Sequence, residues 1–326
     1  MITIRLLVLM LACLGLAQAQ SNEPLRLEKT IPLPDVQGRI DHMSVDVKNQ
    51  RLFVAALGNN TVEVIDIKAG TRVHSIPGFR EPQGVLYLPD VNRLYVASGG
   101  DGSLRIFDGS SFQLLKTLEY GDDADNVRYD AGEDRVYVGY GSGGLGALHK
   151  DGSKIGFIRL DSHPESFQFE REGPGIYVNL PKSHKVVLID RTAWDVIESW
   201  GTDGALSNYP MALDETDRRL FIVCRAPATL EVLDTSSGHI IAKLPVVGDS
   251  DDVFYDSARK RIYATGGEGA ISVYQQQDAD HYKEIATIPT VKGARTSFFS
   301  ADLNRFFVAV RRQGSQSAAI RVYRTE

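Results

Sequence analysis

The chain has 326 residues and a formal net charge of −6, with 36 Lys and Arg residues against 42 Asp and Glu residues. Mild acidity argues against nonspecific nucleic-acid binding as the main role, so we expect no nucleic-acid partner. The chain has only two cysteines, and Cys224 is expected to remain as a buried thiol once an export signal is removed. Its stability must therefore come from packing.

The first 19 residues have the pattern of a secretory signal peptide. Arg5 is followed by an apolar run over residues 6–16, and the tripeptide Ala-Gln-Ala ends at Ala19. We predict cleavage after Ala19 and a periplasmic or secreted location. A lipoprotein anchored through Cys13 is the alternative, but the residues before Cys13 are a poor match to a lipobox. We expect no membrane span elsewhere in the chain.

A short apolar strand phrase, usually preceded by a basic residue, recurs through the rest of the chain. The second residues of its seven copies are Leu52, Leu94, Val136, Ile176, Leu220, Ile262 and Phe306. This spacing of 40–44 residues is typical of propeller blades, which must stack because no single repeat can bury its own face. We therefore predict one all-β domain over residues 20–326, a seven-bladed β-propeller with four antiparallel strands in each blade.

The first repeat shows how the four strands are arranged. Strand-like runs cover residues 42–47, 52–57, 62–67 and 72–76, separated by turn-forming residues. The second run is densely apolar, as expected for a strand that packs on both faces. The third run alternates apolar and polar residues, which predicts a position nearer the outer surface.

The two ends of the chain are predicted to share one blade. The seventh repeat stops after its third strand, residues 319–324, while residues 25–33 resemble the fourth strands of other repeats. Pairing these two segments would close the ring and remove two exposed edges.

Several strands carry a family resemblance. Arg93–Ala97 and Ile176–Asn179, together with the apolar-Asp strands Val64–Asp66 and Leu188–Asp190, resemble the YVTN-type, YncE-like β-propellers. The resemblance covers residues 25–326 and implies the fold, which a broad group including quinoprotein dehydrogenases and surface-layer proteins shares. It implies little about function. The WD40 signature is not matched, because the two tryptophans do not recur from repeat to repeat.

Polar residues gather where each inner strand is expected to begin. In a propeller these strands line the central channel, and positions ten and eleven residues before each anchor form two equivalent rings. The predicted ligand-binding candidates in these rings are Asp41, His42, Gln83, Asp125, Asn126, Glu165, Tyr209, Asp251, Asp252 and Arg295. We expect a small ligand or a protein partner to bind at this rim. The alternative is that these side chains only bond to the backbone of neighbouring turns.

The same rings offer oxygen and imidazole groups suited to a divalent cation, although no cofactor is predicted. The residues that could supply such ligands are Asp41, His42, Asp125, Asn126, Glu165 and Asp252. A metal-dependent, lactonase-like hydrolase that uses this carboxylate-rich rim is therefore the alternative function.

No motif for covalent haem, zinc proteases or serine hydrolases occurs in the chain. The leading prediction is therefore an exported, monomeric, non-catalytic propeller that binds a ligand, a metal or a partner at its rim. A quinone-cofactor dehydrogenase is a weaker alternative based on fold analogy alone, because the rings offer only Tyr209 as an aromatic platform.

Overall fold

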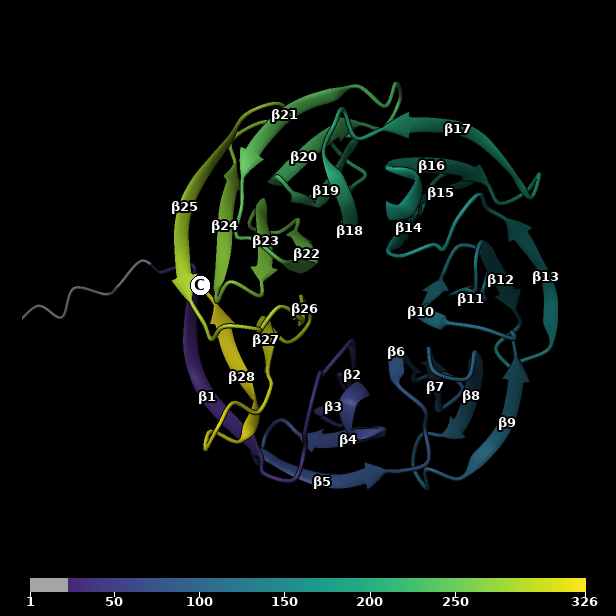
Figure 1. Ribbon diagram of the computed structural model, residues 1–326, viewed down its shortest axis with the longest axis vertical. Helices are drawn as coiled ribbons and strands as arrows, with labels where there is room; N and C mark the ends of the chain where they lie inside the picture. Colours follow the sequence, from purple (N-terminus) through teal and green to yellow (C-terminus); the bar gives the residue numbers. More distant parts are fainter. Residues whose placement is uncertain (1–22) are drawn as a thin grey trace, which may run out of the picture.

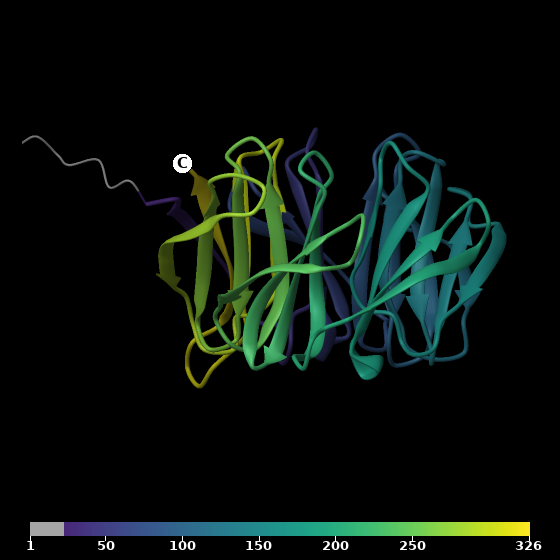
Figure 2. The ribbon, with the colours of Figure 1, turned by 90° about the horizontal axis from the view of Figure 1, so that it is seen from above.

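The computed structural model describes residues 23–326, so the predicted signal peptide and its cleavage site lie outside the described residues. Seven four-stranded antiparallel sheets are arranged in a ring around a central axis (Figure 1). Seen from above, the ring is one layer of blades (Figure 2). The prediction of an all-β, seven-bladed propeller is confirmed. Within the described range, no helix is long and apolar enough to cross a membrane.

In each blade the first strand lies nearest the axis and the fourth lies on the outside (Figure 1). The first three blades contain β2 (Met43–Asp46), β3 (Arg51–Ala56), β4 (Thr61–Asp66), β5 (Thr71–Ile76); β6 (Pro82–Leu88), β7 (Arg93–Ser98), β8 (Ser103–Asp108), β9 (Leu114–Glu119); and β10 (Ala124–Asp130), β11 (Arg135–Tyr140), β12 (Gly144–Leu148), β13 (Lys154–Arg159). The next three contain β14 (Phe167–Phe169), β15 (Gly175–Leu180), β16 (Lys185–Asp190), β17 (Asp195–Gly201); β18 (Leu206–Asp214), β19 (Arg219–Ala226), β20 (Ala228–Asp234), β21 (Ile240–Pro245); and β22 (Ser250–Asp256), β23 (Arg261–Gly266), β24 (Ala270–Gln276), β25 (Tyr282–Pro289). Single 3-10 turns, η1 (Leu57–Asn59) and η2 (Pro181–Ser183), follow β3 and β15.

The seventh blade contains both ends of the described chain. Its sheet has the order β1-β28-β27-β26, in which β1 (Leu25–Leu33) pairs antiparallel with β28 (Ala318–Thr325). The inner strands of this blade are β26 (Ser297–Ser300) and β27 (Arg305–Val310). The predicted closure by the N-terminal strand is confirmed. Because β1 pairs with β28, the outer edge of β28 is covered.

The recurring strand phrase has a packing explanation. The residue after each anchor is aromatic in all seven blades, and all seven of these rings are completely buried. They are Phe53, Tyr95, Tyr137, Tyr177, Phe221, Tyr263 and Phe307. Each large ring is packed within the blades, where apolar burial contributes most to stability. Cys224 in β19 is also fully buried, and burial raises the pKa of its thiol to about 12.

The third strands lie outside the second strands, as predicted, but two of their alternating polar residues are buried. Glu63 in β4 and Glu231 in β20 are both completely buried. The hydroxyl of Ser75 donates to Glu63 Oε1 at 2.9 Å, whereas Glu231 makes only an ion pair, at 3.3 Å, with Lys243. The solvent-facing strands are the fourth ones, where apolar side chains such as Leu114 are half exposed.

Candidate functional site

The polar residues that precede the inner strands converge at one end of the channel. A small cavity of about 30 Å³ at this mouth is lined by Arg39, Asp41, His42, Asp125, Asn126, Arg128, Glu165, Ser166, Tyr209, Asp251 and Asp252. We call this set the channel mouth. It brings together eight of the ten predicted candidates, from blades one, three, four, five and six. Residues that are 211 positions apart in the chain, such as Asp41 and Asp252, thus face one space.

The other two candidates do not line the mouth, because neighbouring carboxylates hold their side chains. Gln83 Nε2 donates to Asp123 Oδ1 at 3.2 Å. Arg295 places Nη1 2.7 Å from Asp249 Oδ1 and Nε 2.8 Å from Asp251 Oδ2. Arg295 therefore contacts the lining residue Asp251 without lining the mouth itself, and Gln83 contacts Asp123, which lies outside the lining set.

One half of the mouth is centred on His42. Its Nε2 lies 3.8 Å from Asp41 Oδ1, and its Nδ1 lies 3.8 Å from Asp252 Oδ1. The second oxygen of each carboxylate is already bonded: Arg39 Nη2 lies 2.6 Å from Asp41 Oδ2, and the Ser297 amide donates to Asp252 Oδ2 at 2.7 Å. The imidazole is therefore placed between two carboxylates whose outer oxygens are fixed.

Burial dominates the protonation of this half. It raises the pKa of Asp252 to about 7, although His42 and the Ser297 amide act in the opposite direction. Burial also raises the pKa of Asp41, against the positive charges of His42 and Arg39. For His42, burial opposes the charged form, but the charges of Asp41 and Asp252 outweigh it and raise its pKa.

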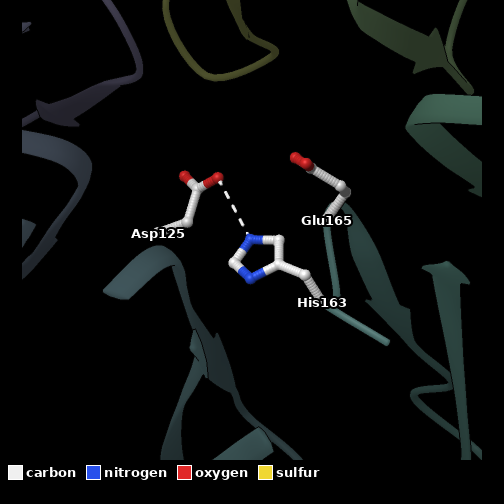
Figure 3. Close-up of side chains that lie close together, drawn as sticks. All are labelled: Asp125, His163 and Glu165. Carbon is white, nitrogen blue, oxygen red and sulfur yellow. Dashed lines mark ion pairs between the residues drawn. The ribbon is translucent and has the colours of Figure 1, made fainter. Parts of the chain in front are cut away.

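The other half of the mouth contains Asp125, His163 and Glu165 (Figure 3). One ligand-type atom from each residue lies within 4.8 Å of the other two. His163 Nε2 is 3.8 Å from Asp125 Oδ2, and His163 Nδ1 donates to the carbonyl oxygen of Gly141 at 2.6 Å. Two adjacent blades, the third and the fourth, therefore supply one imidazole and two carboxylates to a single point.

The charges in this half are tightly linked. Burial, and then the charge of Asp125, raise the pKa of Glu165 to about 8. Burial disfavours protonation of His163, but Asp125, the Gly141 carbonyl and Glu165 outweigh it and raise its pKa to about 9. Burial also opposes ionisation of Asp125, yet the nearby histidines and Arg39 hold its pKa below the usual value.

The sequence analysis did not name Arg39, Arg128 or Ser166 of the lining set, nor His163, which lies beside that set next to Asp125 and Glu165. His163 lies thirteen residues before the anchor Ile176, two positions outside the rings that were counted. The same count from the other anchors gives Arg39, Asp123 and Asp249, which also lie at or beside the mouth. A third ring counted at this position would have identified His163.

Arg128 lies eight residues before its anchor, inside the inner strand β10. Its Nη2 donates to Ser166 Oγ at 2.9 Å, and its guanidinium lies 5.5 Å from the centre of the Phe167 ring. Burial lowers the pKa of Arg128 to about 10. Its position within the inner strand β10, between Val127 and Tyr129, was the available signal.

A larger cavity of about 280 Å³ adjoins the mouth within the channel. It shares the lining residues His42, Asn126, Arg128 and Asp252 with the mouth. The rest of its wall includes the apolar side chains Met43, Leu86, Phe254 and Phe298. The charged mouth and the more apolar cavity are therefore adjacent, and these four shared residues form the boundary between them.

Comparison with known proteins gives little similarity at the level of sequence. No protein-family model matches the chain. An uncharacterized WD repeat-containing protein from Synechocystis sp. is 33% identical over 86 residues, which are 26% of this chain and 23% of that protein. The chain thus matches about a quarter of the length of this curated relative, a match to WD40-like repeats and not to a whole protein.

Solved structures are similar over nearly the whole chain. WD40 repeats of RRP9 align with a TM-score of 0.78 at 11% identity, over 93% of this chain and 100% of that one. A chain of the mitotic checkpoint complex aligns with a TM-score of 0.77 at 13% identity, over 99% of both chains. A chain of Kuenenia stuttgartiensis hydrazine synthase aligns with a TM-score of 0.73 at 16% identity, over 88% and 97%. These likenesses show the propeller fold.

Proposed function

We propose that this chain is an exported, YncE-like propeller that binds a small amphipathic ligand in its central channel without transforming it. The observation that carries the proposal is the wall common to the charged mouth and the apolar cavity. A ligand that spans both would place a polar group near Asp252 and an apolar group against Phe254 and Phe298. Pockets of this mixed character are typical small-molecule sites. Export is supported by the signal-like pattern of residues 1–19.

Charge favours a cationic polar group on this ligand. Five carboxylates and two arginines line the mouth, and Asp252, which the mouth shares with the cavity, can ionise near neutral pH and pair with a cation. The cavity volume of about 280 Å³ is suited to a molecule the size of one aromatic ring with a short side chain. An arylalkylamine meets both conditions, since its ammonium can approach Asp252 while its ring packs against Phe254.

Thermal unfolding with tyramine and phenethylamine tests this function. We expect either amine at millimolar concentration to raise the Tm, because a ligand that binds only the folded state stabilises it. The variants Phe254→Ala and Asp252→Asn should lose this shift. Phe157→Ala, which removes a ring that is 61% exposed on β13, is the matched control and should keep it.

The charge argument has its own control. Aryl carboxylates of the same size, such as 3-phenylpropionate, should give a smaller shift than the amines at pH 8, because the ionised Asp252 carboxylate repels them. Equal shifts from amines and carboxylates, or an amine shift that survives in Phe254→Ala, would contradict the proposed site.

The second candidate function is the metal-dependent, lactonase-like hydrolase. The observation that favours it is the convergence of Asp125, His163 and Glu165 within 4.8 Å. A cation held there would polarise a carbonyl oxygen at the open end of the mouth. Hydrolysis of δ-valerolactone above the buffer rate in the presence of Zn²⁺ or Mn²⁺, and its loss in Glu165→Gln, would support this candidate. No turnover with either ion would leave binding as the function.

A further inference from the structure

We propose that Asp125, His163 and Glu165 bind one divalent first-row transition cation, of the Zn²⁺ or Mn²⁺ class, at the channel mouth. This inference deepens the proposed function, because it assigns an ion to the same mouth. It rests on the proposed function only in that both use this location. Its grounds are the orientation of one imidazole, one buried carboxylate oxygen that accepts no hydrogen bond from residues 23–326, and the geometry of the set.

The orientation of His163 is fixed by its second ring nitrogen. A carbonyl oxygen can only accept a hydrogen bond, so the 2.6 Å contact with Gly141 makes Nδ1 the donor. Nε2 then faces Asp125 and Glu165 (Figure 3), and at 3.8 Å from Asp125 Oδ2 it is too far for a hydrogen bond. His163 is only 5% exposed. A buried imidazole with one nitrogen tied to a carbonyl and the other directed at further ligands is the usual arrangement of a metal-binding histidine, and a bound cation would displace the proton on Nε2.

One oxygen of the Asp125 carboxylate lacks the partner that buried carboxylate oxygens normally have. Asp125 is 8% exposed, and within residues 23–326 its buried Oδ1 accepts no hydrogen bond. Glu165 is half-buried and comes from the next blade, so it approaches the same point from the other side of the interface between blades. A buried, unsatisfied carboxylate is costly, and a bound cation removes that cost.

The geometry of the set fits a small cation with an open coordination position. Ligand atoms that are 2.0–2.2 Å from one ion lie at most about 4.4 Å apart, so the observed limit of 4.8 Å requires a shift of about half an ångström. The longer and more exposed Glu165 side chain can make that shift. One imidazole with two carboxylates favours Zn²⁺ or Mn²⁺ over Ca²⁺, which takes six to eight oxygen ligands.

The His42 half of the mouth does not have these properties. Its imidazole faces a carboxylate through each nitrogen, Asp41 on one side and Asp252 on the other, and no carbonyl fixes its tautomer. The second oxygens of these carboxylates are bonded to Arg39 and to the Ser297 amide. His42 therefore lacks the carbonyl-fixed orientation that His163 has, and we do not assign the ion to it.

The experiment is a titration of the mature protein, after treatment with EDTA and dialysis, with ZnCl₂ and with MnCl₂ by isothermal calorimetry. We expect one equivalent of at least one of these ions to bind. His163→Ala should weaken binding about 100-fold and Glu165→Gln at least about tenfold, because each removes a ligand atom. His281→Ala, at an exposed histidine that pairs with Asp278 away from the mouth, is the control and should leave binding within about threefold of wild type.

Three results would overturn the inference: less than 0.2 equivalents of either ion bound, equal affinities in wild type and Glu165→Gln, or a loss in His42→Ala with retention in His163→Ala. Glu165→Gln keeps the side-chain shape, so it remains informative if His163→Ala does not fold. Phe254→Ala separates this inference from the proposed function, since it should abolish the tyramine shift and leave ion binding unchanged. Loss of the amine response alone contradicts the ligand proposal, and loss of ion uptake alone contradicts the metal site.

Discussion

The main-chain amide of Ser297 in the seventh blade donates to Oδ2 of Asp252 in the sixth, at 2.7 Å. This bond fixes the Asp252 carboxyl at the boundary between mouth and cavity, where burial raises its pKa to about 7. The position of Asp252 has consequences for stability as well as for binding.

Asp252 should make stability fall as the pH rises from about 4 to 7. The folded chain keeps this proton up to a pH near 7, whereas an unfolded aspartate loses it near pH 4. Folding therefore takes up a proton in this range, and the free energy of unfolding decreases by up to ~1.4 kcal/mol per pH unit. In Asp252→Asn this contribution is absent, so the variant should gain stability relative to wild type up to pH 7 and no further above it.

Urea unfolding at pH 5, 6, 7 and 8 measures this difference. Asp302→Asn, at an exposed aspartate in the turn before β27, is the control and should follow wild type at every pH. A constant difference between Asp252→Asn and wild type over this range would show that Asp252 does not carry the proton.

Closure of the ring by β1 predicts an unusual sensitivity near the N-terminus of the described chain. Ile31 is fully buried in β1 opposite Ile320, whereas Leu27 in the same strand is 48% exposed. Ile31→Ala should lower the free energy of unfolding by about 2–5 kcal/mol, and Leu27→Ala by less than about 1 kcal/mol. Chemical denaturation measures both variants, and similar losses would show that the strand is not packed as described.

The two buried glutamates of the third strands should respond in opposite ways to an apolar replacement. Glu63 accepts hydrogen bonds from Ser75 Oγ at 2.9 Å and from Arg72 Nη1 at 3.3 Å, so Glu63→Leu leaves two half-buried donors without this partner and should cost about 1–3 kcal/mol. Neither oxygen of Glu231 accepts a hydrogen bond from the described residues. Glu231→Leu should therefore be neutral or stabilising, because a poorly compensated buried charge is removed. A Tm that falls equally in both variants would contradict this distinction.

Gly84 should be required for the close approach of blades two and three. A methyl group at Gly84 would overlap the main-chain oxygen of Asp125, whereas one at Gly201 would have no atom within 4 Å. Gly84→Ala should therefore cost about 1–3 kcal/mol by overpacking, while Gly201→Ala should cost almost nothing. Because Asp125 would be displaced, Gly84→Ala should also weaken any binding at the mouth. Equal Tm values for the two variants would be inconsistent with this packing.

The fold could be predicted in detail because its signal is repeated seven times. The anchors and the aromatic residue after each of them occupy the same buried place in every blade, so each copy reinforces the others. The closing strand was predictable for the same reason, since its sequence matched a missing fourth strand. The alternation of polar and apolar residues in β4 placed this strand correctly, but it did not predict that Glu63 is buried. Alternation cannot distinguish a polar side chain that faces solvent from one that faces a buried polar partner.

The site was predictable in position but not in composition. Counting from the anchors locates where an inner strand begins, and this placed eight candidates around one mouth. The count does not give the direction of a long side chain, which is why Arg295, turned toward Asp249, was included. It was also stopped two residues too early to reach His163. The raised pKa values of Asp252 and Glu165 result mainly from burial, and burial arises only when the blades have assembled into the ring.

The pairing of β1 with β28 also bears on how the protein reaches its folded state. Leu25 lies opposite Thr325, so the last sheet joins segments that are about 300 residues apart. Bringing them together has an entropic cost that grows with the intervening length, and contacts of long range slow folding. Six blades can form from consecutive segments, but the seventh requires that nearly all of the described chain be present. Until then β1 has an unpaired edge, so the period before ring closure is when this protein is most exposed to aggregation.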